Sequence, residues 1–219
     1  MHDATKQGDR FPGYDVMSKR PGPSWNNKTR EVIAQRLSIG SKPCFFTPTE
    51  FRSVVAIAER IVPQTTTRPP VPIAALIDDK LHKGRLDGYR QPNMPRDGDA
   101  WRLGLKALDA EAEAAFDGGF HQLDEEQQDA MLERMQRGEL RHPVWDGMPS
   151  DTFFKARLAR DIIFAYYSHP TAWSEIGFGG PASPRGYVRM DFDERDPWEA
   201  AEAKDGDPTA AYRKNRRVR

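Results

Sequence analysis

The stretch Phe45–Pro63, FFTPTEFRSVVAIAERIVP, carries the clearest structural signal in the chain. Thr47, Pro48 and Glu50 form a capping box, in which a threonine N-cap is followed by proline at the first helical position and glutamate at the third. Apolar residues then recur at helical spacing on one face: Phe51, Val54, Val55, Ala58 and Ile61. Pro63 cannot continue a helix. The stretch therefore predicts an amphipathic core helix between Thr47 and Pro63.

Further helices are predicted on both sides of this stretch, and no segment shows a competing strand alternation. A last helix, opened by Ser150 or Asp151, is expected to end at Pro170. The others are Thr29–Leu37 with Asn27 or Thr29 as cap, Ile73–Leu81, a long helix over about 98–117 ended by Gly118-Gly119, and a helix capped by Asp124 with Gln127 at its third position. The predicted fold class is all-α, a compact helical domain of about five to six helices.

The two ends of the chain are expected to be long irregular arms around this domain. Residues 1–27 and 169–219 are rich in Pro, Gly and polar residues, which leaves 28–168 as the helical domain. The basic end Arg213–Arg219 is expected to be disordered. Aromatic residues are spaced through both arms, and aromatic anchors dominate interface energetics. We expect them to contact a partner protein, although packing on the chain's own helices is the alternative: Phe11, Tyr14, Trp25, Trp173, Phe178, Tyr187, Phe192 and Trp198.

Composition excludes several classes of protein. The chain has 219 residues, enough to bury a core, with 37% hydrophobic residues. Lys+Arg and Asp+Glu balance at 33 each, so overall charge gives no case for nucleic acid or an anionic membrane. The longest apolar runs are too short to span a bilayer, and the first forty residues lack the apolar region of a signal peptide. The single Cys44 excludes an internal disulfide.

The sequence contains no recognisable catalytic, cofactor-binding or metal-ligating set. No dinucleotide fingerprint, P-loop, nucleophile elbow or H-E-x-x-H motif occurs. The five histidines have no zinc-ligand spacing with neighbouring residues. Gly177–Gly180 lacks the strand and helix of a phosphate cradle, so a turn is expected there. The carboxylates after Asp124 are explained by the helix dipole and by solvation.

In order and spacing, several segments resemble the gluconate 2-dehydrogenase subunit 3 family. The resemblance runs from about Phe45 to about Tyr187 and begins with the F-F/T-x-x-E start and the E-R-I-V-P ending of the first helix. It continues through the second helix, Tyr89-Arg90, FHQLDEEQQDAML at Phe120–Leu132, and GFGGPASPRG at Gly177–Gly186. Members of the family are small accessory (gamma) subunits of bacterial flavin dehydrogenase complexes. Some carry a twin-arginine signal, which is not seen here.

The resemblance implies a non-catalytic subunit that binds and stabilises a flavin-dependent sugar or polyol dehydrogenase. The partner would be a glucose–methanol–choline-type flavoprotein that holds FAD, acts on CH–OH groups and passes electrons to a cytochrome c or another acceptor. This chain would aid the assembly and export of the partner. Both the cytoplasm and the periplasm are compatible with the sequence. A heterodimer burying well above about 1,600 Å² is expected.

Two alternatives do not depend on the resemblance. One is an independent enzyme whose metal or Cys/His site is built through space from His121, His142 and Cys44. The other is a stand-alone helical binding protein that uses the basic tail.

Overall fold

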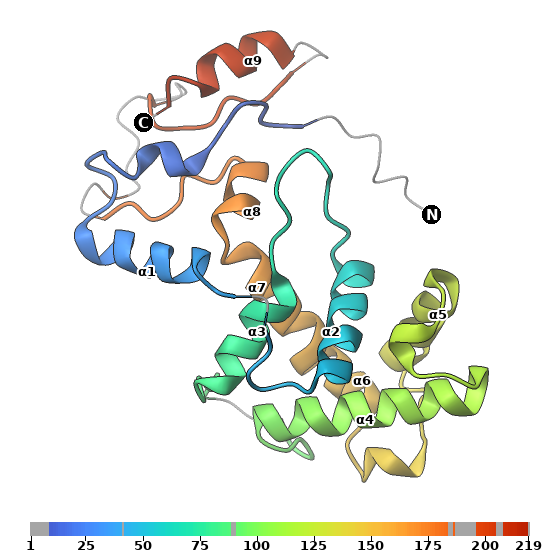
Figure 1. The fold of residues 1–219 in the computed structure, drawn as a ribbon. Coiled ribbons are helices and arrows are strands. Elements are labelled where there is room, and N and C mark those ends of the chain that lie inside the picture. The colour runs from blue at the N-terminus through green and yellow to red at the C-terminus, as the bar shows by residue number, and fades with distance from the viewer. Residues whose placement is uncertain are drawn as a thin grey trace. The chain divides into compact units, whose positions relative to one another are not determined.

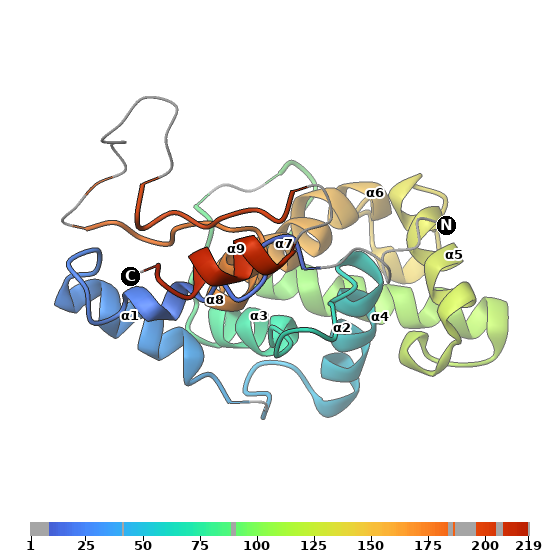
Figure 2. The same cartoon turned by 90° about the horizontal axis from the view of Figure 1, so that it is seen from above.

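The computed structural model describes residues 9–40, 42–88, 91–183, 186, 196–204 and 208–218 (Figures 1 and 2). The all-α prediction is confirmed. In the described part of the chain, an isolated bridge between Trp25 and Ser183 is the one β feature. The α-helices are α1 (Asn27–Leu37), α2 (Pro48–Ile61), α3 (Ile73–His82), α4 (Asp97–Phe116), α5 (Glu125–Gln136), α6 (Ser150–Phe153), α7 (Ala159–Tyr167), α8 (Pro170–Glu175) and α9 (Pro208–Asn215). Shorter turns are 3-10 helices at Val16–Lys19, Phe120–Gln122 and Pro143–Trp145, and a π-helix at Phe154–Leu158 joins α6 to α7.

The chain divides into two compact units, each assembled from segments that are separate in the sequence. Unit 1 is Met1–Ser38, Gln64–Val71 and Tyr167–Arg219, and unit 2 is Ile39–Pro63 and Pro72–Tyr166. This differs from the predicted division into a 28–168 domain with two separate arms. Helix α1 groups with the described residues of both predicted arms in unit 1. The sequence could not indicate this grouping, because packing between distant segments leaves no periodic pattern.

In unit 2, the start of α2 follows the sequence prediction. The Thr47 hydroxyl accepts from the Glu50 backbone N–H, and the Glu50 side chain accepts from the Thr47 N–H, which completes the capping box. The Asp78 carboxylate on α3 fixes the chain just before this cap. It accepts from the backbone N–H groups of Cys44, Phe45 and Phe46 at 2.7, 3.0 and 2.8 Å. The entry to α2 is therefore tied to α3, against which α2 packs.

The core of unit 2 is built around α4, which packs against α2 and α6 (Figure 1). Trp101 is fully buried and meets the Phe46 and Phe153 rings edge to face, with centroids 5.8 and 5.9 Å apart. Gly104 leaves space for Phe153, because a Cβ at this position would clash with the Phe153 ring. Met131 and Met135 of α5 are fully buried, as their spacing predicts. The apolar spacing along 98–117 predicts Phe116 on the same face as Trp101, but Phe116 is 38% exposed.

Three helix boundaries differ from those expected. Asn26, rather than Asn27 or Thr29, caps α1 and accepts from the Thr29 N–H. Asp117 closes α4 in the left-handed conformation (φ 58°), one residue before the glycines predicted to end it. Pro170 begins α8 as well as ending the helical run before it, because proline is also favoured at a first helical position. In contrast, the cap of α5 by Asp124 and Gln127 is confirmed.

Unit 1 has its own apolar core, drawn from segments far apart in the sequence. Its buried cluster is Tyr14, Val16, Trp25, Ile33, Trp173 and Val218, with Phe11, Met17 and Ala200 packed against it. The predicted turn at Gly177–Gly180 is present, with φ +69° at Gly177 and +68° at Gly180. At Gly177 a Cβ would lie 2.5 Å from the Phe11 ring, so a glycine is required there on both counts.

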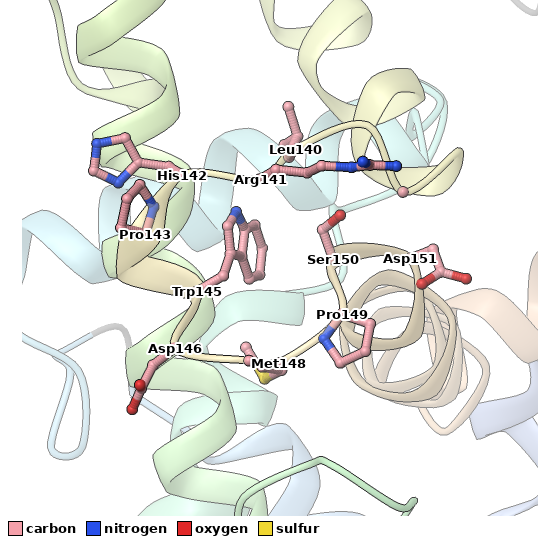
Figure 3. Close-up of a pocket in the computed structure, with 12 residues that line it drawn as sticks. Leu140, Arg141, His142, Pro143, Trp145, Asp146, Met148, Pro149, Ser150 and Asp151 are labelled. Carbon is pink, nitrogen blue, oxygen red and sulfur yellow. The ribbon is translucent and has the colours of Figure 1, made fainter.

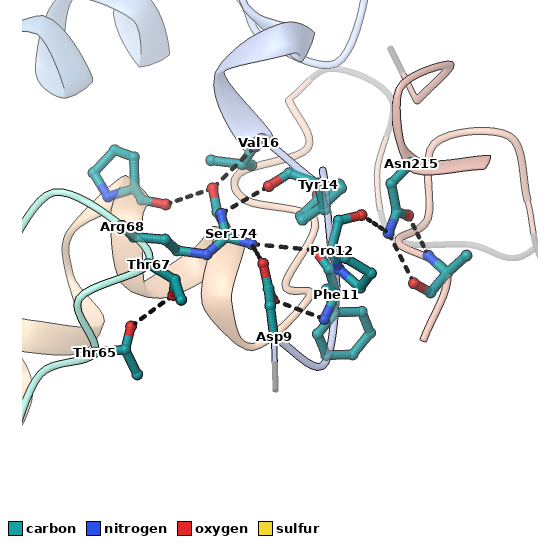
Figure 4. A network of polar contacts seen from close by, with 12 residues as sticks. Asp9, Phe11, Pro12, Tyr14, Val16, Thr65, Thr67, Arg68, Ser174 and Asn215 are labelled. Carbon is teal, nitrogen blue, oxygen red and sulfur yellow. Dashed lines mark hydrogen bonds and ion pairs between the residues drawn. The ribbon is translucent and has the colours of Figure 1, made fainter. Parts of the chain in front are cut away.

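Polar contacts tie the N-terminal segment of unit 1 to its other parts (Figure 4). The Arg68 guanidinium donates to the Tyr14 and Phe11 carbonyls at 2.9 and 3.1 Å and pairs with Asp9 at 2.9 Å. The Ser174 hydroxyl on α8 accepts from the Val16 N–H at 3.1 Å. Because these bonds satisfy backbone groups of the segment, residues 9–17 are an integral part of the unit.

The C-terminal end of unit 1 corrects a prediction. Residues 213–219 were expected to be disordered, but Arg213–Asn215 complete α9 and Val218 is 1% exposed in the unit's core. Asn215 is buried, accepts from the Ala201 N–H at 2.6 Å and donates to the Pro12 carbonyl at 2.9 Å. The basic composition concealed this because Val218 and Asn215 are isolated positions among charged residues.

His169 makes the stability of unit 1 dependent on pH. Its Nδ1 accepts from the Thr171 N–H and so caps α8, which requires that this nitrogen be unprotonated. Burial, and secondarily the nearby Arg36 charge, lower the pKa of His169 below its usual 6.5. The unfolded chain therefore binds a proton at higher pH than the folded chain. The stabilisation is complete above pH 6.5 and falls as the pH drops from there through the lowered folded pKa.

We expect urea midpoints followed by tryptophan fluorescence to fall between neutral pH and pH below 6.5. His169→Asn keeps a capping side chain but removes the titration, so its midpoint should depend less on pH over that range. The control is His82→Asn, which removes an exposed histidine at the C-terminal end of α3 and measures the general effect of replacing an imidazole with an amide. If the urea midpoint of His169→Asn fell with pH as steeply as that of the wild type, the assignment of this pH dependence to His169 would be wrong.

Candidate partner-binding site

Helix α7 carries an exposed apolar stripe in addition to its buried face. The buried face includes Ile162 and Tyr166. The α7 stripe consists of Ile163 and Phe164, whose exposed fractions are 43 and 63%. These two neighbouring side chains form one exposed apolar area on the part of α7 that belongs to unit 2. In a surface helix that buries only one face, these positions would carry polar residues. The exposed apolar side chains of the α7 stripe therefore need another explanation.

The sequence also indicates that α7 has more apolar residues than one buried face needs. The run from Ile162 to Tyr167, IIFAYY, is apolar around the whole helix, with large side chains everywhere except at its alanine. Helical spacing places Ile162 and Tyr166 on one face, and both are buried. The remaining large apolar residues of the run were then left without a core position, and that surplus marks an exposed apolar face.

A buried ion network holds the start of α7 within unit 2. The Asp161 side chain is 1% exposed, accepts from the Trp101 indole N–H at 2.8 Å and pairs with Lys80 at 2.9 Å. The Arg157 side chain, 5% exposed, pairs with Asp87 at 2.9 Å and Asp97 at 3.0 Å. Buried charges are tolerated only when paired and hydrogen-bonded, and these contacts link α3, α4 and the segment 154–161.

The charges of Lys80 and Asp87 are stabilised by this pairing. Burial lowers the pKa of Lys80, but its hydrogen bonds to Asp87 and Asp161 outweigh burial and raise that pKa. Burial likewise raises the pKa of Asp87, but hydrogen bonds from Lys80 and Arg157 outweigh it and lower the pKa. Both groups are held in their charged forms.

A π-helical turn separates α6 from α7 and contains Arg157. It spans Phe154–Leu158, and the backbone runs on into α7 without a break. A π turn inserts an extra residue into a turn of helix, so the side chains after it are rotated relative to those before it. Arg157 and Leu158 of the turn are buried, and the α7 stripe follows it. Propensity alone does not predict a π turn, which explains why the sequence missed it.

The eight residues expected at a partner interface lie in different environments. Tyr14, Trp25 and Trp173 are at most 5% exposed within the core of unit 1, which is the packing that the sequence left as the alternative. Three others keep exposed surface: Phe11 and Trp198 are half-buried, and Phe178 is 41% exposed, with its ring edge to face on Trp173. Tyr187 and Phe192 lie outside the described residues. That Phe178 contacts a partner stays a prediction.

The residues of the alternative metal or Cys/His site are placed separately in unit 2. Cys44 is exposed. His142 uses its Nδ1 to accept from the Val144 N–H, as a cap for Pro143–Trp145. His121 is half-buried, and its Nδ1 has no hydrogen-bond partner within the described part of the chain. No group of three or more His, Cys, Asp or Glu side chains with metal-binding geometry occurs among the residues that the structure describes.

Comparisons with known proteins identify one family. The sequence model of gluconate 2-dehydrogenase subunit 3 matches residues 48–180. These residues include all of α2, the ion network and the α7 stripe. No curated protein and no solved structure gives a significant match. Within the described ranges, no helix is both long and apolar enough to cross a membrane.

Proposed function

Because the chain belongs to the gluconate 2-dehydrogenase subunit 3 family, we propose that it is a non-catalytic accessory subunit of a dehydrogenase complex. It binds the catalytic subunit, stabilises its folded form and aids its assembly and export. The family match over residues 48–180 is the observation that carries this proposal. The α7 stripe supports it, since an exposed apolar face on a helix is typical of a protein interface.

The proposed partner is a glucose–methanol–choline-type flavoprotein that holds FAD and oxidises a CH–OH group of a sugar or polyol. Electrons leave it for a cytochrome c or another acceptor. The flavin and the reacting groups belong to the partner, and this chain supplies a binding surface.

The α7 stripe is the part of this chain that we assign to the catalytic subunit. Among the large hydrophobic residues that the structure describes, Phe164 has the greatest exposed fraction, 63%. Aromatic side chains are enriched among residues that dominate binding energy. The Arg160 guanidinium lies 5.5 Å from the Phe164 ring centroid. Arginine beside an aromatic ring is a common pairing at the centre of an interface. The ion network fixes the helix that presents these groups, which limits the ordering cost on binding.

The stabilising role is tested by producing the catalytic subunit with and without this chain. We expect the flavoprotein to unfold at a higher temperature and to retain its flavin longer when this chain is bound, because a ligand of the folded state stabilises it by mass action. Dilution below the dissociation constant should remove the difference. A catalytic subunit with the same unfolding temperature and flavin retention in both preparations would contradict the proposal.

A further inference from the structure

Unit 2 contains a pocket that neither the α7 stripe nor the ion network uses. Its volume is about 360 Å³, and one continuous segment, residues 138–151, supplies the lining (Figure 3). Leu140, Trp145 and Met148 form buried apolar walls, with exposed fractions of 2, 4 and 3%. A pocket of this volume lies within the range of small-molecule sites, which are mostly apolar with a few placed polar groups.

The segment is held in shape by contacts from α4 and by its own backbone. One Glu111 oxygen accepts from the His142 backbone N–H at 2.6 Å and from the Trp145 indole N–H at 3.1 Å. The chain then turns through Asp146 and Gly147, both with positive φ, at 48° and 80°. The Trp145 ring is therefore fixed before any ligand enters, which lowers the cost of binding.

Two polar groups of the pocket have no partner among the residues that the structure describes. Ser150 is 3% exposed, and its buried hydroxyl makes no hydrogen bond to them. Arg141 is exposed and lines the pocket, and its side chain makes neither an ion pair nor a hydrogen bond with them. Figure 3 shows the Ser150 hydroxyl turned toward the Arg141 side of the segment. A buried hydroxyl without a partner is costly, so Ser150 has a hydrogen-bond donor available for an acceptor at this pocket.

The charges around the pocket select the kind of acceptor. Arg141 is a cation with no carboxylate paired to it in the described ranges, whereas Asp151 is already paired with Lys155 at 3.2 Å. Figure 3 shows the Asp146 and Asp151 carboxylates pointing away from the space between Trp145 and Ser150. A carboxylate oxygen can accept from both a hydroxyl and a guanidinium, and guanidinium–carboxylate bonds are among the strong ones.

We propose that this pocket binds a small organic carboxylate, with its oxygens bonded to the Ser150 hydroxyl and the Arg141 guanidinium and its apolar body against the Trp145 ring. Donation by Ser150 requires its side chain to change rotamer, because the hydroxyl oxygen is buried in this conformation. His142 lies on the other side of Trp145 in Figure 3, and its Nδ1 is occupied by the Val144 N–H. We therefore assign ligand binding, and not catalysis, to this pocket. This assignment does not depend on the proposed function.

The test uses 4-fluorobenzoate as probe, with the full chain and fluorine NMR. We expect saturable binding of the carboxylate and at least about tenfold weaker binding of the neutral analogue 4-fluorobenzyl alcohol, the loss expected for one charge-assisted hydrogen bond. Arg141→Gln should weaken 4-fluorobenzoate binding by a similar factor. Ser150→Ala should weaken 4-fluorobenzoate binding by a smaller factor. It should leave the circular dichroism spectrum and the melting temperature unchanged. Lys106→Gln, an equal loss of charge on the exposed side of α4, is the matched control and should bind like the wild type.

Two results would overturn the proposal. One is equal affinity for the acid and the alcohol, and the other is acid binding that survives both Arg141→Gln and Ser150→Ala. A second arm distinguishes the source of the carboxylate. N-acetylphenylalanine that binds more tightly than 4-fluorobenzoate, while its amide does not bind, identifies the C-terminus of a chain as the ligand. Tighter binding of 4-fluorobenzoate than of N-acetylphenylalanine identifies a free acid as the ligand.

Discussion

Replacing Phe164 with glutamate is expected to weaken the complex with the catalytic subunit at least about 30-fold, because central aromatic anchors contribute about 2 kcal/mol or more. The glutamate would also have to be desolvated against an apolar partner surface. The isolated chain should be nearly unaffected, since Phe164 is 63% exposed. Its free energy of unfolding should change by no more than about 0.5 kcal/mol. Titration calorimetry and thermal melts measure the two effects separately.

The matched control is Phe116→Glu, which places the same charge on another exposed phenylalanine of unit 2, at the end of α4. It should bind the catalytic subunit as the wild type does. Equal losses in both variants would indicate a general effect of added charge. Undiminished binding by Phe164→Glu would remove the α7 stripe from the interface.

Replacing Arg157 with methionine is expected to destabilise unit 2 by about 3–5 kcal/mol, the usual cost of removing one partner from a buried ion pair. The substitution keeps the apolar stem but leaves Asp97, whose side chain is 7% exposed, without its cation. Asp87 would keep only Lys80. The corresponding fall in melting temperature is about 6–20 °C, measured by calorimetry.

Lys155→Met is the control, because it removes a cation from the same π turn at an exposed site. Lys155 is 61% exposed and pairs with Asp151 at 3.2 Å, so its loss should cost less than about 1 kcal/mol. Arg157→Lys should recover only part of the stability, since an ammonium group does not reproduce the planar fork of a guanidinium. Equal melting temperatures for Arg157→Met and Lys155→Met would show that the network does not hold α7.

Local signals in the sequence predicted the helices whose ends are fixed by neighbouring side chains. The caps of α2 and α5 each depend on residues three positions apart, so a short window contains all the information needed. Short elements at the C-terminal end were not predictable in this way. Helices α8 and α9 depend on distant partners, such as the Pro12 carbonyl that accepts from Asn215. Tertiary contacts supply the stability of short helices, and a sequence window does not contain them.

The candidate site shows the same limit. Spaced aromatic residues on a polar segment look alike whether they pack on their own chain or on another. Trp25 and Trp173 were expected at an interface, yet they are buried in the core of unit 1. The ion network was not predicted, because Lys80, Asp97 and Asp161 are ordinary helical charges until the fold brings them together. The α7 stripe could have been found, since IIFAYY has more large apolar residues than one buried face accommodates.

Association with a flavin-containing catalytic subunit decides whether this chain is an accessory subunit of a dehydrogenase complex. The most direct test is to co-express it with its catalytic subunit, isolate it through a tag on this chain, and record the visible absorbance of the eluate. We expect a yellow complex that contains both subunits and shows the flavin bands, and a colourless preparation when this chain is expressed alone. A colourless eluate without the large subunit, although that subunit is present and folded in the same cells, would contradict this expectation.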